Sequence, residues 1–235
     1  MPTGIKLHCG GSASTLDDLR SIKLPEETRT YKPVSHYDLA INISKTAEDL
    51  LAWDMDHVLS EFALASNGQR MFAKLTYRDP DNDEMGLSIA FRNSYDKSIR
   101  VGIAVGASVF ICDNLCLAGE VTIFRKHTKN VLEDMNRDIV GAIHRGRTKF
   151  DQIVDDAQEL RAMALNDDES YKLIGLLYGR KVLSKVSQIP VASKQWEGGN
   201  NKWDLYNACT EALKSTSPNK IMECHINLHS ILMGA

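Results

Sequence analysis

The side chains most able to do chemistry gather in a basic stretch at residues 125–149, which holds seven lysines and arginines against three acids. Lysine and arginine neutralise backbone phosphates and release counterions, so a local positive patch favours nucleic-acid binding even where the formal net charge is −3. An ordinary solvated helix face is the alternative interpretation. We predict that a basic track contacts phosphates through these residues: Arg100, Arg125, Lys126, His127, Lys129, Arg145, Arg147 and Lys149.

An acidic segment follows at residues 151–170, with seven acids and one arginine. A helix that is basic at one end and acidic at the other could pair head to tail between protomers, which predicts a homo-oligomer. Closely spaced carboxylates could also imitate the charges of DNA. The competing function is therefore a mobile-element protein that inhibits a host defence enzyme by protein–protein contact.

Motifs for catalysis are missing from the sequence: it has no nucleophile elbow, P-loop, His-Glu-x-x-His or Gly-x-Gly-x-x-Gly. We therefore predict a non-enzymatic protein without a cofactor. Four residues have a spacing that zinc tolerates, although no Cys-x2-Cys pair occurs: Cys112, Cys116, His225 and His229. Buried thiols and surface histidines explain this spacing more simply, so no metal site is predicted.

The composition is that of an ordinary globular protein, 43% hydrophobic and 25% charged. No uncharged run reaches the roughly 18–20 residues that a membrane span needs, and the first residues lack a secretory signal. The five cysteines are an odd number and widely spread, which favours reduced thiols. We expect a cytoplasmic protein with no membrane partner.

Hydrophobic periodicity predicts the elements that must position the basic track. Residues 1–43 show no sustained period and contain several glycines and prolines, which predicts an extended N-terminal arm with one short helix near residues 15–22. From residue 44 onward, apolar residues recur at helical spacing, so we expect a helix that Asn67 and Gly68 end.

A run rich in β-branched and aromatic residues comes next, and short turns divide it. Short turns favour an antiparallel meander, because parallel neighbours need a long crossover. Bulky residues alternate with small ones along residues 101–109, so the bulky face should be buried. We predict four strands, at residues 71–77, 87–93, 99–112 and 117–124.

A long helix over about residues 129–163 should follow, with Gly141 and Gly146 allowing a kink. The predicted fold class is α+β: a four-stranded antiparallel meander packed on a long helix, with additional C-terminal helices. The α+β core should span residues 44–165, and a C-terminal helical region, residues 166–235, should dock on it. Its helices are expected at residues 169–184, 203–214 and 220–232, with an exposed loop at 187–202.

Two segments resemble a known family. The first is Phe91-Arg92-Asn93-Ser94-Tyr95-Asp96-Lys97-Ser98, with later matches at residues 109–115, 119–120 and 125–128. The second is Trp203-x-Leu-Tyr-Asn207-Ala-x-Thr-Glu211-x-Leu-Lys. In order and content they resemble the domain-of-unknown-function-932 family, uncharacterised phage- and plasmid-type proteins, over about residues 70–235. The resemblance implies a bacterial mobile-element protein of the cytoplasm, encoded near recombination or anti-restriction functions, and carries over no catalytic residue.

The order of a helix, a meander and a long helix is also similar in outline to the core of single-strand annealing proteins. Positive charge begins where the last predicted strand ends, which agrees with that outline. We therefore expect a phage- or plasmid-type DNA-metabolism protein that binds single-stranded nucleic acid, and could anneal it, in a basic groove between sheet and helix.

Overall fold

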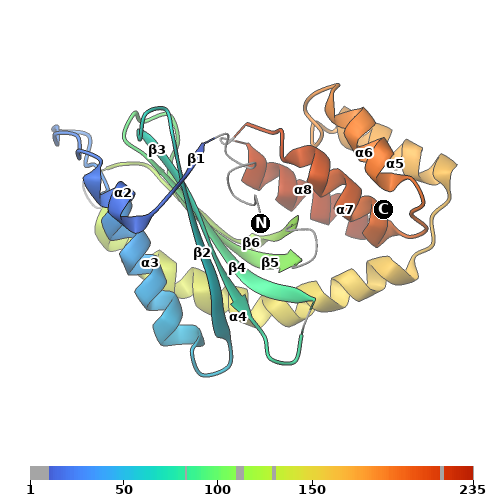
Figure 1. The fold of residues 1–235 in the computed structure, drawn as a ribbon, viewed down its shortest axis with the longest axis horizontal. Helices are drawn as coiled ribbons and strands as arrows, with labels where there is room; N and C mark the ends of the chain where they lie inside the picture. The colour runs from blue at the N-terminus through green and yellow to red at the C-terminus, as the bar shows by residue number, and fades with distance from the viewer. Residues whose placement is uncertain (1–10, 83, 110–113, 129–130, 218–219, 235) are drawn as a thin grey trace.

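A six-stranded antiparallel sheet forms the centre of the computed structural model, which describes residues 11–82, 84–109, 114–128, 131–217 and 220–234 (Figure 1). The strands follow one another in chain order. The predicted α+β class is confirmed, but the sheet has six strands rather than the expected four. They are β1 (Ser12–Ser14), β2 (Asp56–Ala65), β3 (Arg70–Arg78), β4 (Met85–Ser94), β5 (Val101–Val109) and β6 (Asn114–Arg125).

The additional strand β2 corrects the helix that we expected from residue 44 onward. The helix in this region, α3 (His36–Leu51), begins within the expected arm and ends before β2. The strands β2 and β3 form a hairpin whose turn holds Asn67 at φ 53° and Gly68 at φ 81°. Apolar side chains in β2 also fit a helical period, so pairing with β3 decides the outcome rather than periodicity.

One long helix and several short ones accompany the sheet. The short helix α2 (Leu16–Ser21) and the long helix α4 (Val131–Ala162) confirm two predictions, and α4 runs through both of its glycines as one element. Of the described helices, none has both the length and the low charge that a membrane span requires. The C-terminal helices are α5 (Asp167–Gly179), α6 (Gln188–Trp196), α7 (Lys202–Leu213) and α8 (Ile221–Gly234).

The helix α6 lies in the segment for which we expected an exposed loop, so that expectation was wrong. Its buried side chains include Ala192 and Trp196, which are one helical turn apart. A helix of nine residues shows too few turns for this stripe to be recognised in the sequence.

The helix α4 crosses one face of the sheet, and α3 lies beside it (Figure 1). The bulky face of β5 points to α4: Val101, Ile103 and Val105 are fully buried, as predicted. On the opposite face, the small residue Ala104 packs with Ile221 of α8, so this part of the sheet is covered on both sides.

Gly146 sets the distance between α4 and the sheet. A Cβ atom at this position would lie 2.1 Å from Cγ1 of Val105, far closer than two carbon atoms can approach. Glycine inside a helix costs about 1 kcal/mol relative to alanine. The close contact between helix backbone and strand explains why α4 contains a glycine here.

We expect Gly146→Ala to lower the free energy of unfolding by about 1–3 kcal/mol, because the new methyl group overpacks the contact with Val105. Gly175→Ala is the matched control: it lies in α5 with nothing within 4 Å of its Cβ position, so it should raise stability by about 0.5–1 kcal/mol. Urea unfolding followed by circular dichroism measures both. Stabilisation by both substitutions would contradict the close approach of α4 to β5.

Candidate nucleic-acid interface

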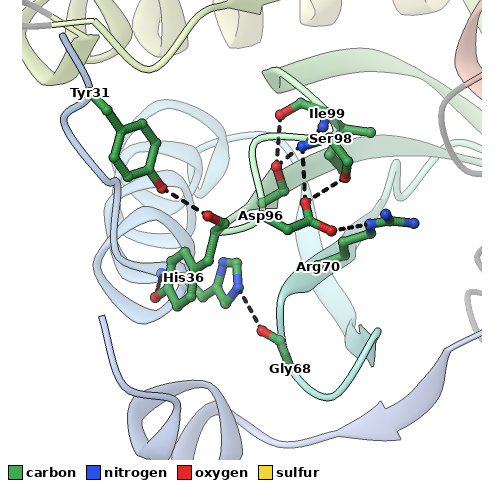
Figure 2. A network of polar contacts seen from close by, with 9 residues as sticks. Tyr31, His36, Gly68, Arg70, Asp96, Ser98 and Ile99 are labelled. Atoms are coloured by element: carbon green, nitrogen blue, oxygen red, sulfur yellow. Dashed lines mark hydrogen bonds and ion pairs between the residues drawn. The ribbon is translucent and has the colours of Figure 1, made fainter. Parts of the chain in front are cut away.

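The segment 91–98, the first segment of the family resemblance, forms the end of β4 and the first part of the turn to β5. Asp96 accepts hydrogen bonds from the backbone N–H of Ser98 at 2.9 Å and from its hydroxyl at 2.5 Å (Figure 2). The guanidinium of Arg70 donates from Nε to the same carboxylate at 2.7 Å. These bonds hold the turn with Lys97 at φ 61° and its side chain exposed.

A buried histidine ties this turn to two other segments (Figure 2). The ring of His36 stacks on the ring of Tyr95, with 3.8 Å between centroids and 4° between planes. Its Nε2 lies 3.1 Å from the carbonyl oxygen of Gly68, and its Nδ1 lies 2.9 Å from Nδ2 of Asn93. Because the amide of Asn93 is a donor, Nδ1 accepts and Nε2 donates, which is the pattern of a neutral imidazole.

Burial lowers the pKa of His36 from 6.5 to about 4. The ring is completely inaccessible to solvent, so a charge on it would lose its hydration. Protonation would also turn Nδ1 into a donor that faces the donor amide of Asn93. The network therefore depends on a neutral His36.

A pocket of about 440 Å³ opens beside this network. Its lining includes three exposed cations and no carboxylate: Lys97, Arg100 and Lys126. The Nζ atom of Lys97 lies 4.3 Å from the centroid of the Tyr31 ring, a cation–π contact. Tyr31 is held in turn by the hydrogen bond from its hydroxyl to the backbone carbonyl of Tyr95, at 3.2 Å (Figure 2).

His127 forms part of the same pocket but is mostly buried. Its ring packs against Tyr31, with 5.5 Å between centroids, and burial lowers its pKa. Its backbone carbonyl accepts a hydrogen bond from the backbone N–H of Lys32 at 3.2 Å. His127 therefore joins the end of β6 to the N-terminal segment and supplies a pocket wall.

The structure thus brings together three of the eight residues of the predicted track: Arg100, Lys126 and His127. Arg125, one residue before Lys126, forms an ion pair with Asp138 of α4 at 2.5 Å. Lys129 lies outside the described residues. The sequence-based prediction missed Lys97 and Tyr31, although the position of Lys97 three residues before Arg100 was a usable signal.

The other three predicted residues lie further along α4, about 24 Å from its start at a rise of 1.5 Å per residue. The guanidinium of Arg147 pairs with Asp54 at 2.7 Å and with Asp151 at 3.2 Å. The ammonium of Lys149 donates to Gln152 at 2.9 Å, and Arg145 is exposed. The predicted residues that the structure describes therefore form two groups.

The acidic segment supplies several bonds within the protein. Asp156 lies 3.1 Å from Nε2 of His229, and Asp167 accepts a hydrogen bond from the indole N–H of Trp196 at 2.9 Å. Glu169 forms a capping box with Asn166 at the start of α5. These carboxylates stabilise the C-terminal helices.

The four residues with zinc-compatible spacing are only partly visible. Cys112 and the side chain of Cys116 lie outside the described residues. His225 is buried in α8, and His229 pairs with Asp156. In the chain segments that the structure describes, no group of three metal-ligating side chains occurs.

The neutral state of His36 predicts a loss of stability in acid. In the unfolded chain His36 is protonated below about pH 6.5, whereas in the folded chain it is protonated only below about pH 4. The contribution of His36 to the free energy of unfolding is therefore complete above pH 6.5 and declines as the pH falls to 4. The loss should reach about 3 kcal/mol. His36→Gln should be less stable than the wild type at pH 7, and the difference should narrow toward pH 4. Urea unfolding across this pH range measures it.

His57→Gln is the control for this comparison, because His57 is an exposed histidine of β2. Its stability should follow the wild-type pH profile. A His36→Gln profile parallel to that of the wild type would show that the buried imidazole is not the group that titrates.

The family model described as Domain of unknown function (DUF932) matches residues 28–228. No curated protein and no solved structure gives a significant match to the chain. The matched region contains Tyr31, the β4–β5 turn and the end of β6, so it includes the whole pocket. The resemblance seen in the sequence is confirmed, and the chain belongs to the DUF932 family.

Proposed function

We propose that the protein binds single-stranded nucleic acid and that the pocket around Lys97, Arg100 and Lys126 holds its phosphates. The observation that supports this most directly is the composition of the lining, which contains these three exposed cations and no carboxylate. The neighbouring carboxylate of Asp96 is already paired with Arg70. Phosphate is the group that such a site selects, because each contact neutralises a charge and releases counterions.

The shape of the site supports a single strand rather than a duplex. The three cations come from two turns and converge on one pocket at the end of the sheet. A flexible strand can place a phosphate and its sugar inside a pocket, whereas a duplex carries its phosphates on a stiff convex surface. The hydroxyl group of Thr128 in the lining can donate a further hydrogen bond to a phosphate oxygen.

We propose binding without catalysis. The exposed groups of the lining offer donors and positive charge, which hold a phosphate but do not activate a nucleophile. The imidazole of His127 could act as a base, but both of its ring nitrogens are buried. A role in the DNA metabolism of a phage or plasmid, with strand annealing in the cytoplasm, extends this proposal and follows the family resemblance.

Two further expectations receive no support from the structure and stay predictions. Head-to-tail pairing of α4 between protomers is not required by its charges, because Arg147 already pairs with Asp54 and with Asp151 of its own helix. Imitation of DNA by the acidic segment is weakened because Asp156, Asp167 and others bond within the protein. The homo-oligomer and the inhibitor of a host enzyme therefore rank below strand binding.

Neutralising the pocket should weaken strand binding and its dependence on salt. The logarithm of the affinity for a single strand falls with the logarithm of the salt concentration by about 0.7 per phosphate contact. The triple variant Lys97→Gln, Arg100→Gln, Lys126→Gln should therefore have a slope smaller in magnitude by about 2. Fluorescence anisotropy of a labelled oligonucleotide, over a salt series, measures this slope.

Arg137→Gln is the matched control, since its side chain is 79% exposed on α4 and lies outside the pocket. It should bind like the wild type. All these residues are exposed, so the variants should have the same melting temperature as the wild type. A triple variant with wild-type affinity and wild-type slope would refute the proposed site.

A further inference from the structure

Trp53 is the most exposed of the large hydrophobic side chains in the described part of the chain, with 78% of its surface accessible. The other two tryptophans, Trp196 and Trp203, are buried. Trp53 lies two residues after the end of α3, and its indole N–H donates to the backbone carbonyl of Leu50 at 2.8 Å. The ring is therefore oriented by its own backbone, and most of its surface is open to a ligand. An exposed aromatic ring is a surface on which a base can stack.

A pocket of about 370 Å³ lies against this ring, at the contact between α3 and α4. Its polar lining comes from Asp54, His144, Arg147 and Thr148. The carboxylate and the guanidinium pair with each other, Nε of Arg147 to Oδ2 of Asp54 at 2.7 Å. Unlike the Lys97 pocket, this site has no surplus of cations in its lining, so it suits a neutral planar ring better than a phosphate.

One hydrogen-bond acceptor at this site is unused. Oδ1 of Asp54 is buried and has no hydrogen-bond partner, while Oδ2 holds Arg147. Exocyclic amines and ring N–H groups of nucleobases are donors that carboxylates accept. A base that stacks on the neighbouring indole carries such groups at its edge. Because Oδ1 is buried, the exposed Trp53 ring has to move aside for such a group to reach it.

We infer that this pocket receives a nucleobase, which stacks on Trp53 and donates an N–H group to Asp54. This inference rests on the proposed function, because the base belongs to the strand whose phosphates occupy the Lys97 pocket. The two pockets lie near opposite ends of α3, a helix of 16 residues and about 24 Å. At 3.4 Å per stacked nucleotide, a strand of about seven nucleotides is needed to reach both.

Abasic oligonucleotides separate the base contact from the phosphate contacts. The wild type should bind an oligoadenylate of about twelve nucleotides five- to 150-fold more tightly than an abasic strand of equal length, the range expected for one stacked base. Trp53→Ala should remove this preference and leave the salt slope unchanged, and Trp53→Phe should keep part of it. Tyr171→Ala is the matched control, because Tyr171 is an exposed aromatic residue of α5 that should not contribute.

Tryptophan fluorescence tests the pocket without a strand. Adenosine monophosphate should quench the exposed component of the emission, which belongs to Trp53, and ribose 5-phosphate should not. If the wild type binds neither oligonucleotide, the proposed function fails, and this titration alone decides the base pocket.

Three results would overturn the inference. Equal binding of both oligonucleotides by the wild type and by Trp53→Ala would show that no base stacks on the ring. Absence of quenching at millimolar adenosine monophosphate would show that no base stacks on Trp53 even without an oligonucleotide. A blue shift of the emission with increasing protein concentration, without ligand, would show that a second copy of the chain covers Trp53.

Discussion

The neutral, buried imidazole of His36 is the contact on which the proposed site depends. It joins three parts of the chain that are distant in sequence: the start of α3, the β2–β3 turn through Gly68, and the end of β4 through Asn93 and Tyr95. A buried polar group is stable only when its hydrogen-bond partners are present. Each ring nitrogen of His36 has one hydrogen-bond partner. Because Tyr31 bonds to the backbone of Tyr95, the same network also fixes one wall of the pocket.

The distribution of charge gives the two ends of α3 different chemistry. Elsewhere in the structure, cations of the helices and strands pair with nearby acids: Arg125 pairs with Asp138, and Arg147 pairs with Asp54. At the Lys97 pocket, three cations share a lining without an acid, so the charge of the lining is not balanced by a lining residue. A site with several cations and no acid in its lining favours an anionic ligand. The lining beside Trp53, in which the charges of Asp54 and Arg147 balance, suits an uncharged planar ring better.

Much of the fold followed from local sequence patterns, and the site did so only in part. The strands β3 to β6 and the helix α4 have long, regular patterns, which is why they were predicted. The strand β2 could not be, because its apolar residues also fit a helix and only its pairing with β3 distinguishes the two. Arg100 and Lys126 were found from their charge. Tyr31 and Trp53 were missed, because the neighbouring residues in the sequence predict neither the long-range contacts of Tyr31 nor the solvent exposure of Trp53.

Photochemical cross-linking tests the central claim, that a single strand lies on the Lys97 pocket, most directly. An oligonucleotide that contains 5-bromouracil would be irradiated with the full-length protein, and the modified peptides would be identified by mass spectrometry. The account predicts adducts within the segments that carry Tyr31, Lys97 to Arg100, and Lys126 to Thr128, and their loss at high salt. Adducts confined to the C-terminal helices α5 to α8, or unaffected by salt, would contradict it.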